Sequence, residues 1–130
     1  MLNGVKNWIT NGNSASVYLV IAQTDAVKGS HGINVFIVEK NSPGIVVGPK
    51  ENKLGIRGSD THSISFNDVI VPKENRIGED GFGFKFAMRT LSGGRIGIAS
   101  QALGIASGAY ELALDYSKQR KAFGKEIIMC

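Results

Sequence analysis

Three residues near the start of the chain have types and a spacing that suit contact with a flat aromatic ring. Trp8, Ile9 and Thr10 lie in a stretch with the character of a β-strand, just before Asn11-Gly12. Side chains two apart in a strand share a face, so Trp8 and Thr10 point one way and Ile9 points into the opposite layer. An indole beside a hydroxyl offers an apolar wall and a hydrogen-bonding group. From spacing alone, a Trp buried in a hairpin core is the favoured alternative.

Arg120 and Phe123 form a second candidate site, inside a basic cluster near the end of the chain (Lys118, Arg120, Lys121 and Lys125). A spacing of three makes Arg120 and Phe123 neighbours on a helical turn. A guanidinium can grip a pyrophosphate through paired hydrogen bonds, and an aromatic ring can pack against an adenosine group. The alternative is a solvent-facing Arg with a Phe closing the helix end, and the residues alone favour it.

Ser92, Gly93, Gly94 and Arg95 form a third candidate, a short polar run at the start of an apolar helical pattern. Arg95 is either a lone helix charge paired with a carboxylate or a direct contact to an anionic substrate. No group of residues has the spacing of a metal site, and His31 and His62 are predicted to be surface or turn residues. No GxGxxG lies between a strand and a helix, which argues against a nicotinamide cofactor.

The elements that must position these residues change period near residue 81. Short apolar stretches predict β-strands, and Asn11-Gly12 is a strong hairpin signal; the strands are expected at 5–10, 17–22, 33–38, 45–47, 63–66 and 69–71. Ile64 and Phe66 share one face of their strand. Residues 73–83 have the composition of a linker. The spacing of the strands predicts an antiparallel sheet or small barrel.

A helix is predicted from about Phe84 to about Lys118, with a kink or break at Gly93-Gly94. Apolar residues follow the 3,4 spacing on two stripes of this helix, so it must be buried on most sides. A β-domain of this size covers only one side. The remaining sides need helices that this chain does not encode, so we expect an incomplete chain or one completed by a partner subunit.

Composition narrows the class of protein. The 130 residues are 42% hydrophobic and 20% charged, which fits a folded domain rather than a disordered or membrane chain. The net charge of +4 comes from mostly scattered basic residues, which gives no reason to expect nucleic acid as a partner. A single cysteine excludes an intramolecular disulfide, and no signal peptide is visible. We expect a soluble protein of the bacterial cytoplasm or mitochondrial matrix, not a membrane protein.

Segments along nearly the whole chain resemble the acyl-CoA dehydrogenase family. Their order and spacing carry the resemblance: GVKNWITNG at 4–12, KLGIRGS at 53–59, ISFNDVIVP at 64–72, GFGFK at 81–85, GRIGIA at 94–99 and RKAFGK at 120–125. The run at 95–104 is most similar to the short-chain, butyryl-CoA branch. The resemblance implies an α+β fold, with a middle β-domain at 1–80 and the first helix of the C-terminal helical domain at 81–130.

The resemblance also implies a function, an oxidoreductase of fatty-acid β-oxidation. Such a flavoprotein removes two hydrogens from a short-chain acyl-CoA and passes electrons to electron-transferring flavoprotein. Trp8, Ile9 and Thr10 would hold the FAD ring, and Arg120 and Phe123 would reach FAD held by another subunit of a homo-oligomer, typically a tetramer. Ser92, Gly93, Gly94 and Arg95 would line the acyl-CoA channel, although the family usually has Asp at position 92.

No catalytic residue is assigned within the chain. The family's catalytic Glu lies beyond Cys130 or, in a minority, at the position of Gly94, so we expect a fragment that is inactive alone. Two alternatives stay open: a non-catalytic β-domain and helix that serve assembly, and a flavin oxidase or hydroxylase on the same scaffold.

Overall fold

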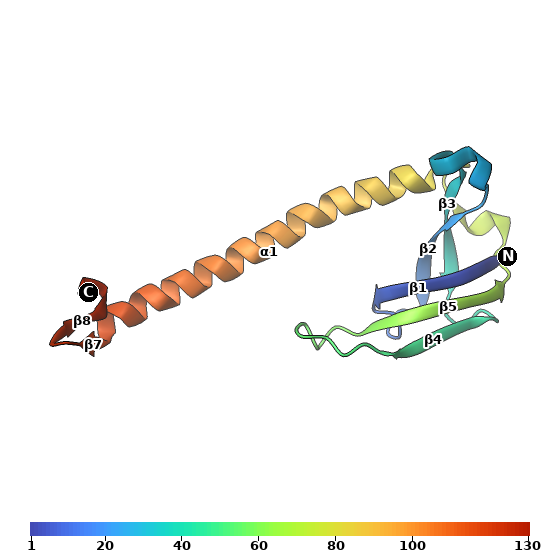
Figure 1. Ribbon diagram of the computed structural model, residues 1–130. Helices are drawn as coiled ribbons and strands as arrows, with labels where there is room; N and C mark the ends of the chain where they lie inside the picture. Colours follow the sequence, from blue (N-terminus) through green and yellow to red (C-terminus); the bar gives the residue numbers. More distant parts are fainter. The chain divides into compact units, whose positions relative to one another are not determined.

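A computed structural model describes residues 1–130, which divide into two compact units, Met1–Ala87 and Met88–Cys130. The first unit, called the β-unit below, contains two three-stranded antiparallel sheets (Figure 1). One sheet has the order β1-β5-β4, with β1 at Leu2–Thr10, β5 at Thr61–Val69 and β4 at Ile45–Lys50. The other has the order β2-β3-β6, with β2 at Val17–Gln23, β3 at Ile33–Glu39 and β6 at Arg76–Ile77. The antiparallel β fold predicted for this part is confirmed.

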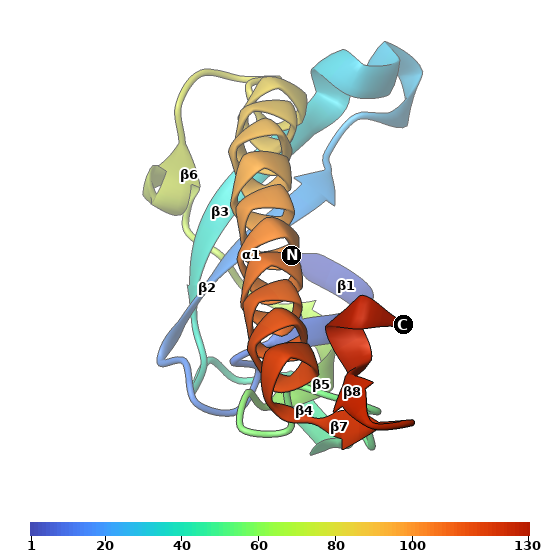
Figure 2. The ribbon, with the colours of Figure 1, turned by 90° about the vertical axis from the view of Figure 1, so that its left-hand side faces the viewer.

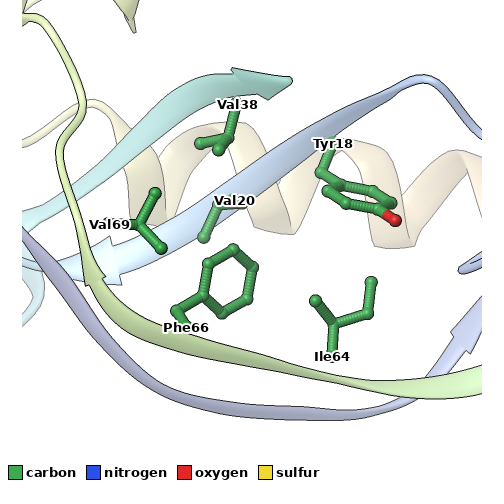
Figure 3. Packing of buried hydrophobic residues seen from close by; sticks show 6 residues of the cluster. All are labelled: Tyr18, Val20, Val38, Ile64, Phe66 and Val69. Atoms are coloured by element: carbon green, nitrogen blue, oxygen red, sulfur yellow. The ribbon is translucent and has the colours of Figure 1, made fainter. Parts of the chain in front are cut away.

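The core of the β-unit is formed by side chains from both sheets (Figure 3). Ile64, Phe66 and Val69 come from β5; they meet Tyr18 and Val20 of β2 and Val38 of β3. Ile64 and Phe66 are both buried, as the alternation of this strand predicts. Removing these apolar side chains from water is the main favourable term that holds the two sheets together.

The hairpin predicted at Asn11-Gly12 is wrong. β1 pairs with β5 in one sheet, whereas the following strand β2 pairs with β3 in the other, so the turn carries the chain from one sheet to the next. Asn11 adopts a φ of 59°, and its backbone N–H donates to the Asp60 carbonyl at 3.0 Å rather than to β2. Contacts from a distant loop therefore decide the direction of this turn.

Two further boundaries differ from the expectation. The predicted strands at 63–66 and 69–71 are one strand, β5, which ends at Val69. The predicted linker at 73–83 contains a short 3₁₀ helix, η2 at Lys73–Asn75, and then β6, which pairs with β3. Another 3₁₀ helix, η1 at Ala26–Gly32, connects β2 and β3.

A buried asparagine anchors the segment that leads into the long helix. Asn34 on β3 is 1% exposed, and its Nδ2 donates to Thr24 Oγ1 at 2.8 Å and to Asp80 Oδ1 at 2.9 Å. Its Oδ1 accepts from the Gly81 backbone N–H at 2.9 Å. Glycine is required at 81, because a Cβ there would lie 2.3 Å from the His31 carbonyl oxygen. The entry to the helix is therefore packed on the β-unit.

The helix α1 runs without interruption from Gly83 to Gln119 (Figures 1 and 2), so the break predicted at Gly93-Gly94 is wrong. At 1.5 Å per residue its 37 residues span about 55 Å. Its large apolar side chains are exposed, with Ile96 and Leu103 both at 72%. A two-stranded hairpin, β7 at Lys121–Ala122 with β8 at Lys125–Glu126, and the 3₁₀ helix η3 at Ile127–Met129 follow. None of the helices combines the length and apolar character that a membrane span requires.

Candidate functional site

The β-strand that carries the first candidate site is interrupted by a bulge. Lys6 pairs with Ile64 and Ile9 pairs with His62, so three steps along β1 match two steps along β5. The extra residue lies between them, and Trp8 has a φ of 58°, in the left-handed region. Simple alternation therefore fails in this part of β1, because a bulge places one additional residue on its strand.

The bulge leaves Trp8 outside the core while Ile9 stays inside it. The Trp8 side chain is 66% exposed, whereas Ile9 packs against the core cluster and Thr10 is exposed beside it. A bulky residue with positive φ costs about 1–3 kcal/mol, and such strain concentrates at functional sites. Stability alone gives no reason for a large aromatic side chain here. The core-Trp alternative is wrong, and this end of β1 is the candidate functional site.

The turn that follows Thr10 is held by the carboxylate of Asp60, which directly precedes β5. Asp60 Oδ2 accepts from the backbone N–H groups of Asn13 at 2.9 Å and Ser14 at 3.2 Å, and Oδ1 accepts from the Ser14 hydroxyl at 2.7 Å. These hydrogen bonds, first that from the Ser14 side chain and then that from Asn13, lower the pKa of Asp60 to about 2. Asp60 is therefore an ionised acceptor at neutral pH.

His62 is not the surface residue that was predicted. It is buried on β5, with Nδ1 2.8 Å from the Gly48 carbonyl oxygen and Nε2 3.5 Å from Asp60 Oδ2. Because a carbonyl only accepts, Nδ1 carries a hydrogen. Glycine at position 12 leaves space for His62, since a Cβ on Gly12 would lie 3.0 Å from the His62 Cβ. His31, in contrast, is exposed in η1 as expected.

An apolar cavity of about 400 Å³ opens beside the same strand end. Its walls include Ile9, Thr10, Leu19 and Phe66, and Lys6 lies at its side. The Lys6 ammonium donates to the Ile21 carbonyl at 2.9 Å and so ties β1 to β2 across the two sheets. Tyr18 also lines the cavity; its hydroxyl donates to the Gly12 carbonyl, and burial raises its pKa. Lys6 and Asp60 had no signal in the sequence beyond their charge.

The second candidate pair lies in the unit Met88–Cys130, but not on a helical turn as predicted. The helix ends at Gln119, and Arg120 is the residue between α1 and β7. Phe123 and Gly124 form the two-residue loop of the β7–β8 hairpin, with φ values of 54° and 78°. Positive φ at both positions is the signature of a type I′ turn. The Phe123 side chain is 96% exposed at its tip, and Arg120 is also exposed.

The third candidate lies within α1. Ser92, Gly93, Gly94 and Arg95 are consecutive helical residues, and all four are exposed. A Cβ at Gly93 or Gly94 would meet no atom within 4 Å. Trp8, Ile9 and Thr10 belong to the β-unit, whereas these four residues, Arg120 and Phe123 belong to the other unit. No group of three or more His, Cys, Asp or Glu side chains is placed to hold a metal ion.

Two family models match the sequence of the chain, one over most of the β-unit and one over α1 and the residues that follow it. The model described as "Acyl-CoA dehydrogenase, middle domain" matches residues 1–69, and that described as "Acyl-CoA dehydrogenase, C-terminal domain" matches residues 81–129. The chain belongs to the acyl-CoA dehydrogenase family.

Among curated relatives, the short-chain specific acyl-CoA dehydrogenase of Megasphaera elsdenii is 56% identical over 97% of this chain and 33% of that protein. The mitochondrial short-chain specific enzyme of Homo sapiens is 52% identical over 95% of this chain and 30% of that protein. The chain thus spans about a third of the length of the curated relatives it matches.

Solved structures share the fold. Butyryl-CoA dehydrogenase from Megasphaera elsdenii has a TM-score of 0.88 at 56% identity, covering 96% of this chain and 33% of that one. A chain of the structure described as electron transferring flavoprotein of Acidaminococcus fermentans has a TM-score of 0.87 at 54% identity, covering 96% and 33%. PigA with FAD and proline has a TM-score of 0.93 at 31% identity, covering 98% and 33%.

Proposed function

We propose that this chain works as part of an FAD-dependent acyl-CoA dehydrogenase that oxidises a short-chain acyl-CoA. The observation that carries the proposal is the exposed Trp8, held at a φ of 58° beside Thr10, in a chain 56% identical to a short-chain enzyme. An exposed aromatic ring on a strained backbone is what a cofactor wall requires, and a stable core would not select it.

The residues at this end of β1 fit a flavin. The Trp8 indole supplies an exposed apolar face, and the Thr10 hydroxyl supplies an exposed hydrogen-bonding group two residues later. Ile9, packed on the core between them, fixes their backbone. Bound FAD supplies the redox chemistry of the reaction, and the protein orients it. The role of Trp8 would be to exclude water from the ring, and that of Thr10 to hold its edge.

The second unit offers groups for the rest of the cofactor and for substrate. Arg120, directly before the β7–β8 hairpin, and Phe123, in its loop, are exposed, so both are free to meet the pyrophosphate and adenosine parts of an FAD bound by another subunit. The polar run from Ser92 to Arg95 would line the channel for acyl-CoA. We propose the same organisation for the chain, a middle β-domain at 1–80 and a helical region at 81–130.

We propose that the enzyme is a homo-oligomer. The exposed apolar side chains of α1 form a surface that water does not favour, and contiguous apolar surfaces of this kind mark interfaces. We further propose electron-transferring flavoprotein as the electron acceptor, and the bacterial cytoplasm or mitochondrial matrix as the compartment. Similarity to bacterial and mitochondrial relatives supports both compartments.

The test uses the full-length enzyme that contains this chain. After purification, the flavin content is measured by absorbance, and butyryl-CoA oxidation is followed with an artificial electron acceptor and then with electron-transferring flavoprotein. We expect a bound flavin, turnover with butyryl-CoA and loss of flavin in the Arg120→Ala variant. An enzyme that lacks flavin would contradict the proposal, and unchanged flavin content in Arg120→Ala would remove Arg120 from the site.

The chain alone serves as the comparison in the same assay. No base for abstraction of the proton next to the thioester is assigned among its residues, and a positioned base typically contributes about 10²–10⁴-fold. We therefore expect no turnover above a protein-free control. A full-length enzyme that binds FAD but oxidises no acyl-CoA, and consumes oxygen with another substrate, would favour a flavin oxidase or hydroxylase. A protein that binds no flavin at all would favour an assembly module.

A further inference from the structure

Among the residues outside the turn after Thr10, Asp60 makes the most hydrogen bonds to it; Tyr18 donates to the Gly12 carbonyl, and the Lys40 ammonium donates to Asn13. Asp60 accepts three hydrogen bonds from the turn through its carboxylate, two from backbone N–H groups and one from the Ser14 hydroxyl. Its backbone carbonyl accepts a fourth from the Asn11 N–H at 3.0 Å. Four contacts from one residue to the segment 11–14 fix the path of the chain directly after the candidate flavin wall.

Asp60 is placed at the right point of the sheet to act on Thr10. It directly precedes Thr61, the residue that pairs with Thr10, and His62 pairs with Ile9. The carboxylate therefore locks both the strand register and the turn at the same end of β1. Elsewhere in β1 the bulge loosens the pairing, because the register shifts between Lys6 and Ile9. Without Asp60, the turn would keep side-chain hydrogen bonds only from Tyr18, which donates to Gly12, and Lys40, which donates to Asn13, and neither residue lies on β5.

The carboxylate is itself braced. The His62 ring lies 3.5 Å from Asp60 Oδ2 and is fixed on its other side by the Gly48 carbonyl of β4. The turn passes close to His62, since a Cβ on Gly12 would lie 3.0 Å from the His62 Cβ. Strand β4, His62, Asp60 and the turn thus form a continuous chain of contacts that ends at Thr10.

We propose that Asp60 is a positioning residue that sets the orientation of Trp8 and Thr10 toward the flavin through the turn 11–14. This inference rests on the proposed function, because it needs a flavin at Trp8 and Thr10. Asp60 does not contact the flavin itself. Its effect is to limit the conformations of the strand end before the cofactor binds, so that binding and reaction do not have to order it.

The experiment compares two carboxylates at opposite ends of β5 in the full-length holoenzyme. Asp60→Ala removes the three carboxylate hydrogen bonds at the Thr10 end. The matched control, Asp68→Ala, removes the hydrogen bond that Asn3 Nδ2 donates to Asp68 Oδ1 at 2.9 Å, at the other end of the β1–β5 pair. Asp60→Asn is the conservative variant, because its amide has the shape to meet the same partners without the charge.

We expect Asp60→Ala to weaken FAD binding and to lower kcat by roughly tenfold or more, since small misplacements of positioning groups have effects of this size. The KM for butyryl-CoA should change less than kcat, because the affected strand end faces flavin and not substrate. The visible absorption of the bound flavin should shift in Asp60→Ala. Asp60→Asn should restore most of kcat and the spectrum, and Asp68→Ala should match the wild type in all readouts.

Three results would overturn the inference. The first is that Asp60→Ala, like Asp68→Ala, keeps the flavin spectrum and kcat of the wild type. The second is that both variants lose kcat and flavin binding equally, which would mean a general effect on the sheet. If Asp60→Ala does not fold, Ser14→Ala decides, since it removes only the 2.7 Å hydrogen bond. An unchanged flavin spectrum in Ser14→Ala would then refute the role of Asp60. A wild-type enzyme that binds no flavin or oxidises no acyl-CoA would instead refute the proposed function.

Discussion

Replacement of Asn34 by Ala tests how the start of α1 is anchored. Asn34 is 1% exposed and makes three hydrogen bonds, to Thr24, Asp80 and Gly81. After Asn34→Ala, Asp80 keeps Arg76 at 3.2 Å, and Thr24 still donates to a backbone carbonyl. The Gly81 N–H loses its partner. The cost is therefore dominated by one unpaired backbone donor.

An unpaired buried donor costs about 1–3 kcal/mol, and the small cavity left by the side chain adds about 1 kcal/mol. We expect Asn34→Ala to lower the free energy of unfolding by about 2–4 kcal/mol. With a urea m-value of about 2 kcal/mol/M, the midpoint should fall by about 1–2 M. The single tryptophan, Trp8, reports unfolding of the β-unit by fluorescence. Hydrogen exchange at Gly81 should rise more than at the middle of β3.

A matched control is Asn75→Ala. Asn75 Nδ2 also donates to β3, to the Ile37 carbonyl at 3.1 Å, but at an exposed position, so its loss should cost about 1 kcal/mol or less. Equal midpoints for Asn34→Ala and Asn75→Ala would refute the reasoning. Asn34→Asp adds a sharper test, because it places a carboxylate against the carboxylate of Asp80. That variant should be destabilised at pH 7 and recover as acid neutralises one of the pair.

Three more predictions follow from single positions. Gly44→Ala should destabilise the β-unit by about 2 kcal/mol or more in urea unfolding, because Gly44 has a φ of 91° and a Cβ there would lie 2.1 Å from the Asn67 carbonyl oxygen; Gly55→Ala, with no atom within 4 Å, should change little. The folded state lowers the pKa of Asp60 from 3.8 to about 2. The difference in the free energy of unfolding between the wild type and Asp60→Asn should therefore be constant above about pH 4 and decline as the pH falls toward 2. A difference that stays constant down to pH 2 would contradict this. Gly104→Ala should raise the helicity of the chain alone, measured by circular dichroism, because Ala favours the helix by about 1 kcal/mol over Gly. In the full-length enzyme this stabilisation should disappear if another helix packs against position 104.

The sheets and the long helix could be predicted because their apolar patterns depend on neighbours within a few residues. Ile64 and Phe66 were predicted to share one face of their strand, and both are buried. The predicted switch to helical spacing near residue 81 precedes a helix that begins at Gly83. The uninterrupted helix through Gly93-Gly94 shows the limit of a local rule. A glycine pair lowers helix propensity by about 1 kcal/mol per residue, and the residues on both sides continue the helix regardless.

The details of the site depend on contacts between distant residues, which local pattern does not contain. The Asn11 N–H donates to the Asp60 carbonyl, and the buried His62 ring is hydrogen-bonded to the Gly48 carbonyl of β4. The bulge at Trp8 has no signal of its own, since positive φ is expected of Gly or Asn rather than Trp. The Phe123-Gly124 loop carried a weak signal, the glycine, which the helical interpretation of Arg120 obscured.

The pairing of β1 with β5 also sets the order in which the β-unit can fold. Thr10 pairs with Thr61, so β1 has no partner in its sheet until the ribosome has delivered residues more than fifty positions later. The β2–β3 pair, joined by η1, closes a much shorter loop. Because distant pairings form late and slowly, we expect the strand that carries Trp8 to join its sheet after the β2–β3 hairpin has formed. During synthesis, the first residues of this chain are therefore among the last of the β-unit to be protected, and mutations in β1 should mainly alter the unfolding rate rather than the folding rate.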